Sequence, residues 1–169
     1  MRIAVRVRKI RARLRLKRLA RSERGVQLAE LAIILPLFLI LFASTAEFGR
    51  FFYEYSTLAK AARSGARYLA SAEVSSAEDG FAKNIVVYGN PEGTGSPVIK
   101  GLKTTNVDII RTGGTGTIPA TVKVQIKDYK YQPIFDLGAL TKNPSLSLKV
   151  DVKPSVTMRY LLTQPLAGS

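Results

Sequence analysis

The pattern of apolar and polar positions divides the 169-residue chain into three segments. Basic and aliphatic residues are mixed over residues 1–25, and a long apolar run, Val26–Ala46, follows. Its last sixteen residues, from Leu31, carry no charge. In an α-helix, at about 1.5 Å per residue, the run reaches about 31 Å, which matches the hydrocarbon core of a bilayer. It therefore predicts a membrane-spanning helix over about residues 26–46.

The same helix is expected to continue without a break to about Ser71, so that the second segment covers residues 26–72. Past the span the pattern becomes amphipathic, because two groups of residues recur at spacings of three and four. The apolar face holds Leu58, Ala62, Gly65, Ala66 and Leu69, and the opposite face holds Lys60, Arg63 and Arg67. The small residues on the apolar face allow another helix or a sheet to approach closely.

The third segment, residues 73–169, begins with a helix signal and a loop signal. Ser75 followed by Glu78 has the form of a capping box, which predicts a short helix ending at about Tyr88. The stretch Gly89–Gly101 is rich in Gly and Pro and predicts a loop.

Strand signals follow in the rest of this segment. Alternation is weak around Val107 and Ile109, clear in Thr121–Lys127, and clear again over Leu146–Tyr160. Pro154 falls inside the last run, so that strand must lie at an edge or bend there. Gly113, Gly114 and Gly116 lack the spacing of a phosphate-binding loop and predict a hairpin loop. The expected fold class is therefore α+β, with the long N-terminal helix packed on a small antiparallel β-sheet.

Composition removes most catalytic chemistry. The chain has no His and no Cys, which excludes Ser-His-Asp triads, Cys-His nucleophiles, Cys/His zinc sites and disulfides. We therefore expect no enzyme, no catalytic residue, no cofactor and no metal.

The positive charge is concentrated at the N-terminus. Of 26 Lys and Arg residues, eleven lie in residues 1–25 beside one acid, whereas the whole chain has a net charge of +14. By the positive-inside rule this places the N-terminus in the cytoplasm and the C-terminal segment across the membrane. The basic tail also suits anionic lipid. A nucleic-acid partner is not expected, because the tail has no aromatic residue on which bases could stack.

Aromatic residues mark the end of the span. Five follow Ala46 closely, namely Phe48, Phe51, Phe52, Tyr53 and Tyr55. Such rings collect at the headgroup level of a membrane, and they also pack helices against their own domains. Among them Glu47, Arg50 and Glu54 share one helical face, which predicts an exposed ladder of ion pairs in preference to a paired-carboxylate catalytic site.

Glu30 is unusual because a carboxylate in an apolar helix is costly unless it reaches the interface or finds a cation. It stands five positions after Gly25, at the end of the basic segment and directly before the apolar run. The segment Arg24–Glu30 resembles a type IV prepilin processing site. That resemblance implies cleavage between Gly25 and Val26 by a prepilin peptidase, and pairing of Glu30 with the new amine of a neighbouring subunit during assembly. Snorkelling of Glu30 to the inner interface is the alternative.

A second block extends the resemblance. The segments AEFGRFFY, from Ala46, and LAKAARSGARY, from Leu58, are similar to TadE-like proteins, the pseudopilins or minor pilins of tight-adherence (Flp-type) pili, over about residues 24–72. Leu31 departs from the related major pilins, which usually have an aromatic residue there, and this leaves the subunit type open. The resemblance implies an accessory role in pilus assembly, surface attachment and biofilm formation. The implied partners are a prepilin peptidase, other pilins and pseudopilins, and the inner-membrane assembly platform. We assign helix or subunit packing to Glu47, Phe48, Gly49, Arg50, Ala62, Arg63, Gly65, Ala66, Arg67 and Tyr68.

Three other hypotheses compete with the pilin-like interpretation. A signal peptide with its apolar region at Leu31–Phe42 and cleavage after Ala46 would release a soluble protein that begins at Glu47. An uncleaved anchor would present a periplasmic binding domain on a single-pass helix. A nucleic-acid or anionic-lipid binder acting through residues 1–24 is the least favoured.

Overall fold

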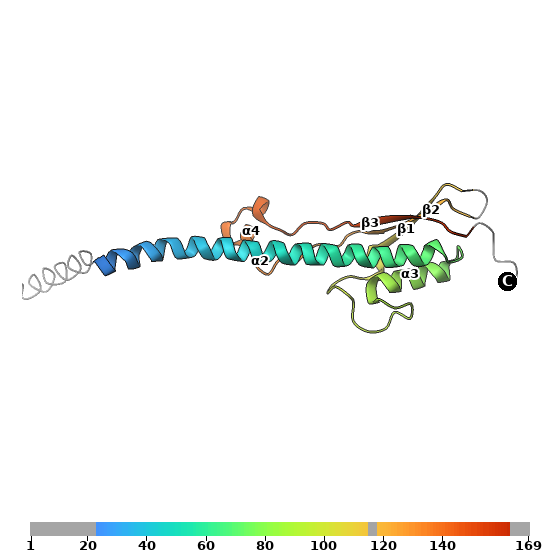
Figure 1. The fold of residues 1–169 in the computed structure, drawn as a ribbon, viewed down its shortest axis with the longest axis horizontal. Coiled ribbons are helices and arrows are strands. Elements are labelled where there is room, and N and C mark those ends of the chain that lie inside the picture. Colours follow the sequence, from blue (N-terminus) through green and yellow to red (C-terminus); the bar gives the residue numbers. More distant parts are fainter. Residues whose placement is uncertain (1–22, 115–117, 163–169) are drawn as a thin grey trace, which may run out of the picture. The chain divides into compact units, whose positions relative to one another are not determined.

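The computed structural model describes residues 23–114 and 118–162. The expectations for the basic leader, apart from its last three residues, lie outside the described residues. The chain divides after Ala46 into two compact units, Met1–Ala46 and Glu47–Ser169, and each is described by itself. Helix α2, Glu23–Ala70, runs through both, and it continues through Pro36 (Figure 1). The predicted long helix is therefore confirmed to within two or three residues at each end.

In the C-terminal unit, α2 is followed by helix α3, Ser76–Tyr88. The helix begins where predicted, and Ser75 Oγ accepts a hydrogen bond from Glu78 N at 3.2 Å, which is the N-cap half of the predicted capping box. The Glu78 carboxylate accepts a hydrogen bond from the Tyr68 hydroxyl, which ties α3 to α2. The helix ends at Gly89, whose φ of 79° is the left-handed conformation that Gly adopts at little cost.

Three antiparallel strands form one sheet in the order β1-β2-β3, with β1 at Val107–Thr112, β2 at Thr121–Ile126 and β3 at Ser155–Arg159 (Figure 1). Short helical turns occur at η1 (Thr104–Asn106), α4 (Leu137–Thr141) and η2 (Pro144–Leu146). The expected α+β class is confirmed. β1 and β2 form the predicted hairpin, and Thr112 pairs with Thr121 across it.

The prediction of a single strand over Leu146–Tyr160 is wrong for its first half. Ile126 N donates to Pro154 O, and the next bridge along the ribbon joins Lys130 to Asp151. Between these two contacts, the chain after β2 has three residues, Lys127–Tyr129, and the chain before β3 has two, Val152 and Lys153. One residue is therefore unpaired, as in a β-bulge. Asp128 lies there with φ of 54°, which interrupts the ladder, and regular pairing on the other side begins only after Pro154.

The core of this unit lies between the C-terminal part of α2, α3 and one face of the sheet. Buried residues from these elements are Leu58, Ala62, Ala66, Leu69, Val86, Val87, Val122, Val124 and Ile126. The predicted apolar face of α2 is therefore confirmed. Gly65 lies where α2 and α3 meet: a Cβ there would fall 2.5 Å from Val86 Cγ2, so the close approach of the helices requires Gly.

Candidate functional site

The first turns of α2 in the N-terminal unit carry the expected processing and assembly residues. Val26 is 56% exposed, and Glu30 is also exposed. The large apolar side chains from Leu31 to Phe42 are exposed as well. Within the described residues, Gly25–Ala70 is the one helix long and apolar enough to cross a membrane, and its most apolar window is not buried at all. An apolar surface of this extent requires contact with lipid or with other apolar protein surface.

Glu30 forms no ion pair or side-chain hydrogen bond with any residue that the structure describes. It therefore differs from Glu47, the next acid along the helix. The pairing of Glu30 with a neighbouring amine and its alternative, snorkelling, both stay predictions.

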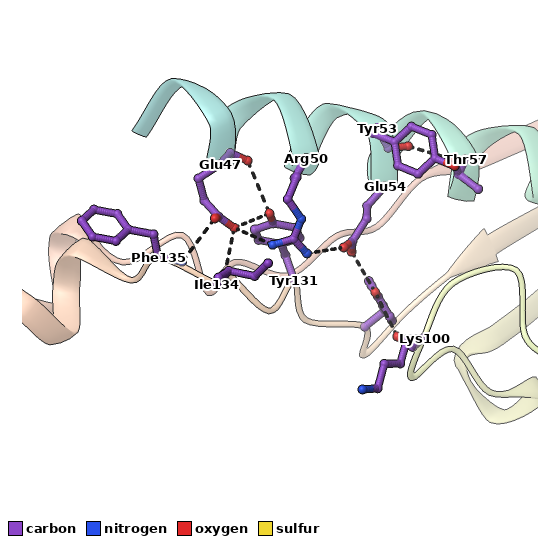
Figure 2. Close-up of polar contacts among 10 residues, drawn as sticks. Glu47, Arg50, Tyr53, Glu54, Thr57, Lys100, Tyr131, Ile134 and Phe135 are labelled. Carbon is purple, nitrogen blue, oxygen red and sulfur yellow. Dashed lines mark hydrogen bonds and ion pairs between the residues drawn. The ribbon is translucent and has the colours of Figure 1, made fainter. Parts of the chain in front are cut away.

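Among the residues of the C-terminal unit that the structure describes, Glu47 is the one buried charged residue, with 4% of its surface exposed. Figure 2 shows its carboxylate enclosed by the segment that follows β2. Oε1 accepts hydrogen bonds from the Tyr131 hydroxyl at 2.5 Å and from Ile134 N at 3.1 Å, and Oε2 accepts one from Phe135 N at 3.2 Å. Three donors from one short stretch of chain thus converge on a single carboxylate.

The electrostatic setting of Glu47 keeps it ionised. Burial by itself raises its pKa, but hydrogen bonds from Tyr131, Phe135 N and Ile134 N, together with the charge of Arg50, outweigh burial. The net result is a pKa below its ordinary value. For Tyr131, burial and its hydrogen bond to Glu47 both raise the pKa, so its hydroxyl stays a proton donor.

Arg50 and Glu54 extend the cluster by one helical turn. Arg50 lies 3.4 Å from Glu47 Oε1 and 3.5 Å from Glu54 Oε1, and its guanidinium lies 5.9 Å from the centre of the Tyr131 ring. The Tyr129 hydroxyl donates to Glu54 Oε2 at 3.0 Å. Two alternate residues of the segment, Tyr129 and Tyr131, therefore bind two carboxylates of α2. Figure 2 shows the contact of Tyr131 with Glu47.

The expectation of an exposed ladder at Glu47, Arg50 and Glu54 needs correction. The ion pairs exist, but the side chains of the two acids are only 4% and 16% exposed, against 40% for Arg50. The reason is that residues 129–135 cover the acids and use them as acceptors. Chemically, the arrangement ties a chain segment to the helix through hydrogen bonds to anionic groups, which are stronger than neutral ones.

The other residues assigned to packing fall into two groups. Ala62, Gly65 and Ala66 are buried within the C-terminal unit, and Tyr68 is partly buried beside α3. Phe48, Gly49, Arg63 and Arg67 are exposed. The exposed group contributes nothing to the core of this unit, so a packing role for these residues requires another molecule.

Sequence reasoning missed Tyr129, Tyr131, Ile134 and Phe135 as partners of the helix acids. Ile134 and Phe135 act through backbone N–H groups, which carry no residue signature. The two tyrosines have a sequence signature, because DYKYQP alternates aromatic and polar residues with the period of a strand that has one face buried.

Comparison with known proteins gives one finding. The family model described as TadE-like protein matches residues 25–67. No curated protein and no solved structure shows significant similarity to the chain. The match confirms the resemblance over the segment that carries Gly25, Glu30, Glu47 and Gly65. Over these residues the chain is similar to TadE-like proteins, and the exposed apolar helix is compatible with a single-pass membrane protein.

Proposed function

We propose that this chain is a pseudopilin or minor pilin that takes part in assembling a tight-adherence pilus for surface attachment and biofilm formation. Its role is structural and not catalytic. The observation that carries the proposal is the coincidence of the family match with a long helix whose large apolar side chains from Leu31 to Phe42 are exposed. A helix that exposes this surface needs lipid before assembly and neighbouring helices afterwards.

In this proposal the precursor is inserted in the inner membrane with the N-terminus in the cytoplasm and the C-terminal unit in the periplasm. A prepilin peptidase cuts between Gly25 and Val26. Glu30 then pairs with the free amine of Val26 on a neighbouring pilin or pseudopilin at the assembly platform. A buried carboxylate and a buried ammonium each cost free energy alone and compensate one another when adjacent, so the pair selects the correct register of packing.

Processing is tested by N-terminal sequencing and intact mass of the protein purified from membranes of cells with and without the prepilin peptidase. A peptidase-dependent start at Val26 is the expected result. A retained leader in both strains would contradict the pilin-like assignment and leave an uncleaved membrane anchor.

The same measurement distinguishes the second candidate, a soluble secreted protein starting at Glu47. This candidate has its own support, because the compact C-terminal unit begins at Glu47 and contains the complete core described above. A peptidase-independent start at Glu47 would establish it. Nucleic-acid binding would depend on residues 1–24, and all but the last two of these lie outside the described residues.

The role of Glu30 is tested by Glu30→Ala, with Glu47→Ala as a matched change of a second helix acid. Glu30→Ala should leave insertion and cleavage intact and lower the co-purification of other pilins, because the amine of the neighbour loses its partner. Co-purification equal to that of the wild type would return Glu30 to the snorkelling alternative. Glu47→Ala should act differently, by loosening residues 131–149.

A further inference from the structure

A basic groove lies beside the open edge of the sheet in the C-terminal unit. It has a volume of about 670 Å³. One wall comes from α2 and carries Lys60, Arg63 and Arg67, and the other comes from β3 and the residue pair after it, with Met158, Arg159 and Leu161. All four cations are exposed. In the described part of the chain none of them forms an ion pair.

The β3 edge beside this groove offers unpaired backbone groups. Tyr160 N donates to Ala120 O, and Ile126 N donates to Pro154 O, at the two ends of the β2–β3 ladder. Hydrogen-bonded pairs alternate in an antiparallel ladder, so Val156 and Met158 also bond to β2.

The intervening residues, Ser155, Thr157 and Arg159, therefore point their N–H and C=O groups away from β2. β3 is the last strand in the sheet order, and among the described residues no hydrogen bond forms on the outer side of Ser155–Arg159. The chain is covered on that side only from Leu161, whose N donates to Ala70 O at 2.8 Å. An exposed strand edge of this kind is a template for another strand.

We propose that the β3 edge and the basic groove together bind an extended acidic segment of a partner protein, which adds to the sheet as a fourth strand antiparallel to β3. Its backbone would pair with Ser155, Thr157 and Arg159. Residues directly opposite Val156 and Met158 would point to the inner face of the sheet, where Arg63 and Arg67 flank the groove. The fitting segment therefore carries acids at every second position.

The charges favour an acidic segment over the other possible occupants of this edge. A second copy of this unit is disfavoured, because residues 47–169 carry fifteen Lys and Arg against ten Asp and Glu, and like charges would meet. Residues 163–169, TQPLAGS, contain no acidic side chain. A phosphate or lipid headgroup would neutralise the cations but would leave the row of backbone groups unpaired. The inference does not rest on the pilus assignment, since binding of a peptide is independent of what the helix assembles with.

The test uses the full chain in neutral detergent micelles and a fluorescent peptide of about eight residues in which Glu alternates with Thr. With Glu facing the groove, the Thr amides are the groups that reach β3, because successive residues of a strand alternate in direction. Methylating the Thr amide nitrogens should therefore abolish binding, whereas methylating the Glu amide nitrogens should preserve it. A peptide with Lys in place of Glu should not bind.

The matched protein variants are Arg63→Gln with Arg67→Gln, and Lys100→Gln with Lys130→Gln. Each pair removes two exposed cations, but only the first pair lines the groove. The first should weaken binding, measured by fluorescence anisotropy at low salt, by about tenfold or more, and the second by less than about twofold.

Three results would overturn the proposal. Equal losses in the two pairs of variants would show a general charge effect. Equal binding of the two methylated peptides would show that the strand edge is unused. Displacement by inorganic phosphate as effective as by unlabelled peptide, at equal ionic strength, would reassign the groove to phosphate groups, whether free or on lipids.

Discussion

Replacing Glu47 tests whether one buried carboxylate holds the segment after β2 on the helix. Glu47→Ala removes the acceptor of three donors, the Tyr131 hydroxyl, Ile134 N and Phe135 N, in a site that is 4% exposed. A buried donor left without an acceptor costs about 1–3 kcal/mol, and hydrogen bonds to charged groups contribute about 1.5–3 kcal/mol each. Because water will reach some of these groups when the side chain is removed, we expect a net loss of about 3 kcal/mol for closing the segment.

Amide hydrogen exchange of the full chain in micelles measures this loss directly. About 3 kcal/mol corresponds to exchange roughly 100-fold faster in peptides covering residues 131–149, since each 1.4 kcal/mol is tenfold. Peptides from α3 and β2 provide the internal control, because neither element contacts the Glu47 carboxylate.

Two milder variants grade the effect. Glu47→Gln keeps one carbonyl acceptor but places an amide against a donor, so it should fall between wild type and Ala. Tyr131→Phe removes one donor and leaves both backbone donors bonded, so it should cost about 1.5 kcal/mol, the lower end of the range for a bond to a charged group. Exchange in residues 131–149 of Glu47→Ala within twofold of wild type would refute the reasoning.

Two further predictions concern pH and helix packing. The pKa of Glu47 is lowered in the folded state from its ordinary value of 4.5, so its stabilising effect is complete above that pH and is lost as the pH falls toward the lower folded value. Protection of residues 131–149 should decline on acidification below about pH 4.5 in wild type, and Glu47→Gln should remove this part of the dependence; equal declines would contradict it. Gly65→Val should overpack against Val86, which costs about 1–3 kcal/mol of unfolding free energy and lowers the thermal unfolding midpoint. Gly49→Ala, with open space around it, should not lower the midpoint. Equal midpoints of the two variants would contradict the close contact at Gly65.

Sequence predicted the helices well because their signals are local. The small-residue face of α2 and the cap of α3 at Ser75 each depend on residues within one or two turns. The same holds for β2, in which Val122, Val124 and Ile126 are all buried and alternate with half-buried polar residues.

The remaining features could not be predicted because they depend on long-range pairing. Leu146–Tyr160 alternates throughout, yet only β3 is regular, since the bulge at Asp128 lies in the partner strand. The burial of Glu47 depends on residues more than 80 positions away in sequence, two of which act through their backbone. No local pattern distinguishes such an acid from one in an exposed ion pair.

The close approach at Gly65 also separates two kinds of sequence constraint. On α2, a single position admits no side chain, because even a Cβ would collide with Val86. The face of β2 that packs against the helices requires only branched aliphatic residues at alternate positions, a condition that many sequences meet. The packing of α2 against the rest of this unit is therefore specified by shape at Gly65 and by apolar character alone along β2.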